Sequence, residues 1–245
     1  MSRARITVAS TALVIALTAR APPPAPEVVE TTLTVTSTQT ETSTAPPPPP
    51  SAAQRVPDDL RAKVASLMVV GVANYDQARF ALDQGAGGLF IPSWADPALL
   101  VEPGRDINAL RAEYDRPFSV AVDFEGGRVQ RHTQVFGQWM PPRALAGQPD
   151  EVIQGSGYDI GRSLRERGVN VDYAPLLDLD VTGLDIIGDR SFGAEPGDVA
   201  RVGGLFSQGL IDAGVTPTFK HFPGHGRATG DTHLTLATTP PLDVL

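Results

Sequence analysis

The sequence predicts an α/β fold of the (β/α)8 TIM-barrel type, with about five of the eight βα units present behind a disordered N-terminal region. Three observations support this prediction. From Val56 onward, short apolar or β-branched runs alternate with helix-like stretches. Several of these runs end in a polar residue, as strands do at the mouth of a barrel. The residues before Val56 lack this alternation.

Residues 1–20 have the pattern of a signal peptide or membrane anchor. Arg3 and Arg5 give a basic start, and an apolar stretch follows from Ile6 to Ala19. This stretch is short for a helix that spans a bilayer permanently, whereas a secretory signal has these features. We therefore expect export to the cell envelope or the extracellular space, with membrane contact only through this segment.

Residues 21–55 are expected to form a disordered linker. Prolines cluster near both ends of this stretch, and threonine recurs at alternate positions from Thr32 to Thr44. Proline favours an extended backbone without internal hydrogen bonds, and threonine offers little apolar area to bury. The linker would hold a folded domain, residues 56–245, away from the cell surface.

The composition of the chain excludes several classes of function. Its net charge is −8, from 20 Lys and Arg against 28 Asp and Glu, so no overall positive field attracts nucleic acid. The chain has no cysteine, so neither disulfides nor thiolate metal ligands can form. Neutral or weakly charged ligands fit this composition better, and we infer no protein partner.

The folded region is predicted to alternate strands with helices. The strands are expected at residues 67–72, 87–91, 118–123, 169–175 and 215–220. Helix-like stretches between them include residues 97–113, 150–167 and 197–213. The last two end at Gly168 and Gly214, where a left-handed C-cap residue is expected. This alternation indicates βαβ units and a parallel sheet, either doubly wound or closed into a barrel.

Polar residues at the ends of the predicted strands favour the barrel. Asp123 ends the third strand, Asp178 and Asp180 lie beyond the fourth, and Lys220 and His221 end or follow the fifth. Several strands that each end in a polar residue are typical of a barrel mouth. A complete barrel has eight strands in about 250 residues, so we expect this sequence to be truncated.

The stretch VAVDFEGGRVQRH, residues 120–132, combines a carboxylate with two guanidinium groups. The predicted strand ends at Asp123, two glycines allow a sharp turn, and Arg128 and Arg131 follow. Carboxylates and guanidinium groups make the directional hydrogen bonds that bind sugar hydroxyls and amides. The alternative is a structural ion pair that pins the loop.

The stretch from Leu176 to Gly193 is rich in aspartate and contains Arg190. One interpretation is that these acids hold Arg190 rigid and direct it at a ligand. The other is a solvated acidic loop without a binding role.

Three of the four histidines lie in KHFPGHGRATGDTH, residues 220–233. His221 and His225 have the spacing of one helical face, but Pro223 between them is incompatible with a regular helix and therefore with a helical zinc motif. A metal-dependent hydrolase that uses His221, His225 and His233 remains a minor alternative.

Asp231 and His233 share one face if the backbone between them is extended. A carboxylate beside an imidazole can fix its tautomer and stabilise the protonated ring. Such a pair can donate and accept protons near neutral pH.

Taken together, these stretches resemble the bacterial β-N-acetylglucosaminidases of glycoside hydrolase family 3. The motifs are KHFPGHG at residues 220–226, D-T-H at 231–233, DFEGGRVQR at 123–131 and IGDRSFG at 187–193. The resemblance extends from about Leu60 to about Pro240, so the N-terminal stretch lies outside it.

The resemblance implies roles for individual residues. Those that bind the sugar would be Asp123, Arg131, Arg190, Lys220 and His221. His233 would be the general acid/base, oriented by Asp231, and no cofactor or metal would take part. Phe124 departs from the family, which commonly has glutamine there. The family's attacking aspartate lies several tens of residues beyond the D-x-H pair, and this sequence stops soon after His233.

The implied activity is release of terminal β-linked N-acetylglucosamine from peptidoglycan fragments, muropeptides or related glycans by a retaining mechanism. That mechanism needs one group to protonate the leaving oxygen and another to attack the sugar carbon. The alternative is a truncated, non-catalytic protein that only binds amino sugars.

Overall fold

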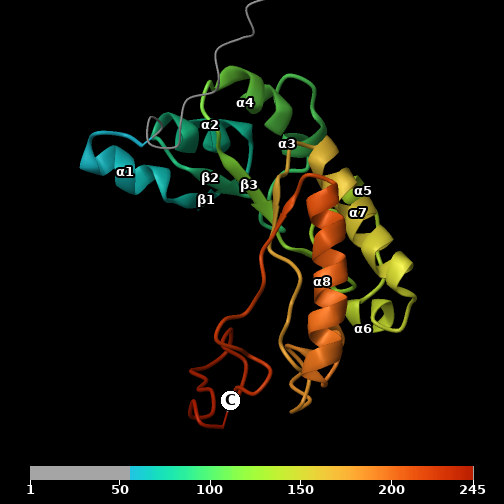
Figure 1. The fold of residues 1–245 in the computed structure, drawn as a ribbon. Coiled ribbons are helices and arrows are strands. Elements are labelled where there is room, and N and C mark those ends of the chain that lie inside the picture. The colour runs from blue at the N-terminus through green and yellow to red at the C-terminus, as the bar shows by residue number, and fades with distance from the viewer. Residues whose placement is uncertain (1–55, 245) are drawn as a thin grey trace, which may run out of the picture. The chain divides into compact units, whose positions relative to one another are not determined.

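The computed structural model describes residues 56–244, shown as the coloured ribbon in Figure 1. The predicted signal segment, residues 1–20, and the predicted linker, residues 21–55, lie outside the described residues. No helix among residues 56–244 is long and apolar enough to cross a membrane.

The central sheet has five parallel strands, one at each predicted position. They are β1 (Val69–Gly71), β2 (Gly88–Phe90), β3 (Ser119–Val122), β6 (Val171–Asp172) and β7 (Thr216–Pro217). Their order in the sheet is their order in the chain, and all four neighbouring pairs are parallel. This order agrees with a TIM-barrel-like fold, because a doubly wound sheet reverses its order at a switch point. That the chain holds only part of a barrel stays a prediction.

Helices occupy most of the stretches between the strands. They are α1 (Leu60–Ser66), α2 (Tyr75–Asp83), α3 (Ala98–Val101), α4 (Ile107–Glu113), α5 (Thr133–Phe136), α6 (Pro142–Leu145), α7 (Asp150–Glu166) and α8 (Pro196–Asp212), with the 3-10 helix η2 (Gly188–Arg190). The two long helices predicted at 150–167 and 197–213 are confirmed within one residue at each end. Gly168 and Gly214 follow them with φ of 80° and 81°, as their left-handed cap positions require.

The predicted helix at residues 97–113 is wrong, because the structure has two helices there. Helix α3 ends at Val101, the backbone of the next residue, Glu102, is extended, and Gly104 then adopts a φ of 80°. Pro103 between them cannot donate a helical hydrogen bond. Helix α4 begins at Ile107, and its N-cap residue Asp106 accepts a 2.8 Å hydrogen bond from the Ala109 N–H through its side chain.

A small antiparallel hairpin, which the sequence analysis did not predict, follows β3 directly. It pairs β4 (Phe124–Gly126) with β5 (Val129–Gln130). Gly126 and Gly127 make its turn with φ of 91° and 57°. A Cβ on Gly126 would lie 2.6 Å from the carbonyl oxygen of Met140, so this position requires glycine for space as well as for conformation.

The core is one cluster of buried side chains, to which the strands and helices α2, α3, α4, α7 and α8 contribute. Helices α7 and α8 run side by side (Figure 1), and α8 contacts β7. Fully buried side chains from strands and helices include Leu89, Val120, Val122, Ile153, Ile160, Leu164, Phe206 and Leu210. Burial of such apolar side chains is the main stabilising contribution to a fold of this size.

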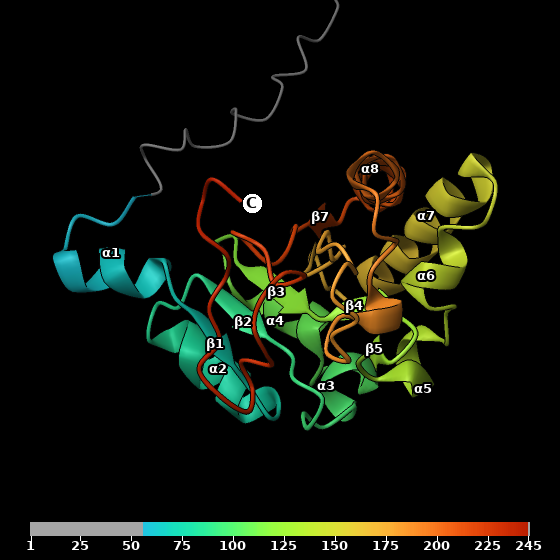
Figure 2. The ribbon, with the colours of Figure 1, turned by 90° about the horizontal axis from the view of Figure 1, so that it is seen from below.

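Residues 221–244 form an irregular C-terminal loop without helix or strand. The carboxyl end of β3 points toward this loop in Figure 1. Figure 2, which looks from below, shows the loop in front of the strands. The loop therefore lies on the side of the sheet where the parallel strands end.

Candidate active site

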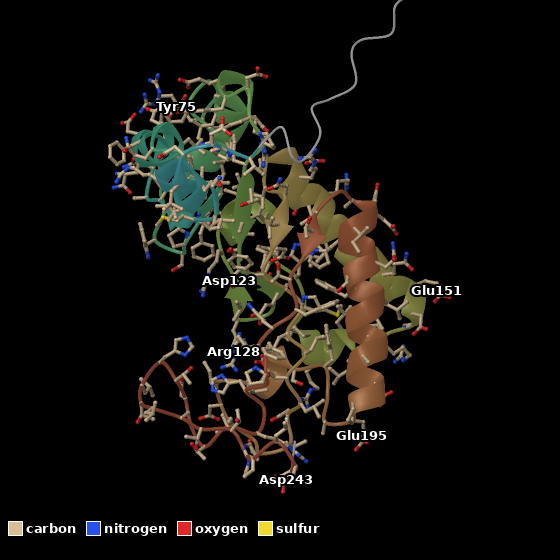
Figure 3. The ribbon with its side chains drawn as sticks, turned by 60° about the vertical axis from the view of Figure 1, so that its left-hand side comes forward. Tyr75, Asp123, Arg128, Glu151, Glu195 and Asp243 are labelled. Carbon is tan, nitrogen blue, oxygen red and sulfur yellow. The ribbon has the colours of Figure 1, made fainter. Side chains whose placement is uncertain are left out.

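Asp123 and Lys220 meet at the carboxyl ends of two strands, although 97 residues separate them in the sequence. Asp123 directly follows β3, and Figure 3 shows it on the side of the C-terminal loop, together with Arg128. The Lys220 backbone follows β7 and pairs with the segment after β6, since its carbonyl accepts a 2.8 Å hydrogen bond from Leu177. Lys220 Nζ donates to Asp123 Oδ1 at 3.0 Å.

Glu125 connects these two residues to Arg190, and the sequence analysis gave it no role. Its carboxylate side chain is only 1% exposed. Arg190 donates to both of its oxygens, at 2.9 and 2.8 Å, and Lys220 Nζ lies 2.5 Å from Oε1. We call Asp123, Glu125, Arg190 and Lys220 the charge cluster.

The charges of the cluster keep Glu125 ionised despite its burial. Burial alone raises the pKa of Glu125, but the hydrogen bonds from Arg190 and the charges of Lys220 and Arg190 outweigh it, so the net shift is downward. Burial likewise lowers the pKa of Arg190, and Glu125 reverses that shift. Each partner thus stabilises the charged form of the other.

Arg190 is held by Glu125 rather than by the aspartates of its own loop, contrary to the sequence-based interpretation. Its side chain is 9% exposed. Besides Glu125, it donates to the carbonyl of Ile186 at 2.7 Å. Three of the five guanidinium donors are therefore used inside the protein.

Arg128 and Arg131, which the sequence grouped together, have different surroundings. Arg128 pairs with Asp189 at 2.8 Å and donates to the carbonyl of Ile187 at 3.0 Å, so it pins the loop before Arg190. The backbone N–H of Arg131 reaches the carbonyl oxygen of Asp123 at 3.4 Å. The half-buried guanidinium of Arg131 makes no hydrogen bond within residues 56–244.

Asp178 joins both ends of the turn that starts after Lys220. Its Oδ2 lies 2.5 Å from His221 Nδ1 and accepts from the His221 backbone N–H at 3.2 Å. Its Oδ1 accepts from the backbone N–H of His225. Burial raises the pKa of Asp178, but the hydrogen bonds from the His221 ring and the His225 backbone outweigh it and the net shift is downward.

Asp231 and His233 are in contact on the C-terminal loop. Asp231 Oδ1 accepts from the His233 backbone N–H at 2.8 Å and lies 2.7 Å from His233 Nδ1. The backbone hydrogen bond, followed by that of the ring, lowers the pKa of Asp231. The His233 side chain is 71% exposed, and within the described residues no hydrogen bond joins it to the charge cluster.

Asp172 is a second buried carboxyl that the sequence analysis missed. It ends β6, and its Oδ1 accepts a 3.0 Å hydrogen bond from the N–H of Phe124, the residue between Asp123 and Glu125. Its Oδ2 has no hydrogen-bond partner within residues 56–244. Burial raises its pKa well above the ordinary value, which favours the neutral form. The available signal was an acidic residue inside an otherwise apolar strand.

The histidines of the minor metal-dependent alternative do not gather in one place. The rings of His221 and His225 are 6.0 Å apart and nearly perpendicular, while His233 pairs with Asp231 instead. In the part of the chain that the structure describes, no three His, Asp or Glu side chains are arranged to hold a metal ion. A cavity of about 410 Å³ adjoins Asp178, Lys220 and His221.

A parallel sheet in chain order, with charged side chains gathered at its strand ends, places the chain in the class of TIM-barrel-like α/β proteins. The chain belongs to glycosyl hydrolase family 3, whose N-terminal domain matches residues 59–245. It is similar to beta-hexosaminidase LpqI of Mycobacterium tuberculosis, with 40% identity over 189 residues, which cover 76% of this chain and 48% of LpqI. These findings confirm the family resemblance.

Solved structures give the same assignment. A glycosyl hydrolase of family 3 from Mycobacterium smegmatis superposes with a TM-score of 0.72 at 43% identity, covering 76% of this chain and 57% of that one. NagZ from Neisseria gonorrhoeae, in complex with N-trifluoroacetyl-D-glucosamine, has a TM-score of 0.60 at 28% identity, covering 69% and 53%. The chain spans about half the length of these relatives.

Proposed function

We propose that this chain supplies the sugar-binding and proton-transfer groups of a β-N-acetylhexosaminidase. The enzyme would release terminal β-linked N-acetylglucosamine from peptidoglycan fragments, muropeptides or related glycans. The observation that carries the proposal is the ion pair between Asp123 and Lys220 at the strand ends, in a family whose similar members are named β-hexosaminidases. Export through residues 1–20 would bring the enzyme to such glycans in the cell envelope.

The sugar would be bound by Asp123, Arg131, Arg190, Lys220 and His221. Carboxylate and cationic side chains make strong, directional hydrogen bonds with hydroxyl and amide groups. The Asp123 side chain is 25% exposed and that of His221 is 38% exposed, so both can reach a ligand. Glu125 would hold Lys220 and Arg190 in place from the buried side.

His233 would act as the general acid/base. Because Asp231 accepts from Nδ1, the ring would present Nε2 to the glycosidic oxygen. In the first step, Nε2–H would give its proton to that oxygen while a carboxylate attacks the sugar carbon and forms a glycosyl-enzyme bond. In the second step, Nε2 would take a proton from the water that breaks this bond.

The attacking carboxylate is not assigned to the aspartates of the 176–193 loop. Asp178 is engaged by His221 and His225, and Asp180 pairs with Arg143 at 2.9 Å. The family resemblance implies an aspartate several tens of residues beyond His233. The proposed activity is therefore that of the whole enzyme, without metal or cofactor.

The test uses the full-length gene product and an aryl N-acetyl-β-glucosaminide. His233→Ala is expected to lower kcat by about 100- to 10,000-fold, the usual contribution of a general acid/base. Thr232→Ala, at the exposed position between Asp231 and His233, is the matched control and should retain activity. Full activity of His233→Ala would reject the assigned role. Sugar binding without turnover in the unmodified protein would favour the non-catalytic alternative.

A further inference from the structure

We propose that Asp178 is the positioning residue of His221: it keeps the ring proton on Nδ1 and leaves Nε2 as a hydrogen-bond acceptor for a sugar hydroxyl. The identity of the ligand rests on the proposed function. The geometry between Asp178 and His221 does not, so the two can be tested separately.

The two side chains are arranged as a buried anchor and an accessible ring. The Asp178 side chain is 1% exposed, whereas that of His221 is 38% exposed. Asp178 Oδ2 contacts both the Nδ1 atom and the backbone N–H of His221, at 2.5 and 3.2 Å. Two contacts to one oxygen restrict rotation of the ring as well as its position.

The protonation state follows from the chemistry of the partner. The hydrogen bonds of Asp178 lower its pKa, so this carboxylate is ionised at neutral pH and can only accept hydrogen bonds. The nitrogen that faces it must therefore carry the hydrogen. In a neutral imidazole the other nitrogen, Nε2, is then an acceptor.

The other charged and titratable groups near His221 do not oppose this arrangement. The His225 ring lies 6.0 Å away, edge to face, and its Nε2 contacts the Gly230 carbonyl oxygen at 3.0 Å. Lys220 Nζ is bound by Asp123 and Glu125. Arg227, which lines the same cavity, donates to the carbonyl of Val244.

The position of Asp178 also explains why the turn after Lys220 can carry a functional ring. Its second oxygen accepts from the His225 backbone N–H, so one carboxylate anchors both ends of the turn. The exposed pair of Asp231 and His233 is separate from this arrangement. The family's proton-transfer pair and the pair proposed here are therefore distinct.

The decisive measurement is nitrogen NMR of the histidine rings in the unmodified chain. The chain has four histidines, and His221→Gln assigns the signals of His221. The spectra are recorded as a pH series, and the tautomer is assigned on the alkaline plateau, where the ring nitrogen signals no longer change with pH. A pyrrole-like Nδ1 with a pyridine-like Nε2 in His221 supports the proposal. The opposite tautomer overturns it without any need for a variant.

A variant extends the test. Asp178→Ala removes the acceptor that faces Nδ1, so His221 is expected to lose its preference for the Nδ1–H tautomer. Asp231→Ala is the matched control, because it removes the partner of His233 and should leave His221 unchanged. A folded Asp178→Ala protein in which His221 keeps the same preference for Nδ1–H contradicts the proposal.

Binding of N-acetylglucosamine separates this inference from the proposed function. If the unmodified chain binds the sugar, Asp178→Ala should weaken binding by about tenfold, the usual loss for one hydrogen bond with a misplaced partner. Unchanged affinity in that variant would count against the role of Asp178. If the Nδ1–H tautomer is observed but the sugar does not bind, the tautomer still supports the Asp178 role, and the sugar assignment fails.

Discussion

Replacing Glu125 with glutamine is expected to destabilise the fold much more than the same replacement at Glu113. Both carboxylates pair with an arginine at 2.8 Å, Glu125 with Arg190 and Glu113 with Arg79. The side chains of the first pair are 1% and 9% exposed, whereas those of the second are 36% and 54% exposed. The two carboxylates therefore differ in burial, and Glu125 also contacts a second cation, Lys220.

The size of each stability loss depends on the cations that the substitution leaves without a carboxylate partner. Glu125→Gln removes the charge that compensates two cations, Arg190 and Lys220, and only the partly exposed Asp123 remains to pair with Lys220. Removing one partner of a buried ion pair costs about 3–5 kcal/mol. Breaking an exposed pair costs about 0–1 kcal/mol, so Glu113→Gln should have a small effect.

The assay is urea unfolding of the unmodified chain and both variants at neutral pH, which gives the free energy of unfolding from the midpoint and slope. Because hydrogen bonding holds the pKa of Glu125 below its unfolded value, its stabilisation is present above about pH 4.3 and is lost as pH falls through the folded pKa. The difference in the free energy of unfolding between the unmodified chain and Glu125→Gln should therefore become smaller over that acidic range. Equal losses for the two variants at neutral pH would refute the reasoning.

Two further substitutions, Gly126→Ala and Asp172→Asn, test the surroundings of the site, and Gly104→Ala is the control for the first. Gly126→Ala should cost about 3 kcal/mol, because it combines a positive φ with a Cβ placed 2.6 Å from the Met140 oxygen. Gly104→Ala, at a similar φ in open space, should cost about 1 kcal/mol, and equal unfolding midpoints would contradict this. As pH rises above about 3.9, the unfolded chain ionises Asp172 while the folded chain resists ionisation there, so the free energy of unfolding of the unmodified chain falls. Asparagine cannot ionise, so Asp172→Asn should gain stability relative to the unmodified chain over that range. Urea midpoints whose difference does not change with pH would contradict this explanation.

The strands and the long helices could be predicted from local pattern. Each predicted strand is a short apolar run with polar residues at or beyond its carboxyl end, and each long helix ends at a glycine with positive φ. That Asp123 and Lys220 lie close together could also be predicted, because both end a predicted parallel strand and such strands end at the same side of a sheet. The break at Pro103 and Gly104 was readable in the sequence, but the helical periodicity on both sides of it led to one helix.

The residue pairs inside the site could not be predicted from local sequence pattern. Glu125 and Arg190 are 65 residues apart, and nothing near either residue indicates the other. The aspartates close to Arg190 in sequence suggested a local partner, whereas the fold brings Glu125 to it from the hairpin after β3, the strand next to β6. The β4–β5 hairpin was missed because its strands are too short for an alternating pattern to appear.

The four members of the charge cluster, two carboxylates and two cations, balance one another before any ligand arrives. These side chains lose most of their rotamer freedom during folding, so a sugar that binds there need not restrict them further. An uncharged saccharide also has no loosely held counter-ion to displace. Its affinity should therefore vary little with ionic strength, unlike that of a ligand recruited by an uncompensated lysine or arginine.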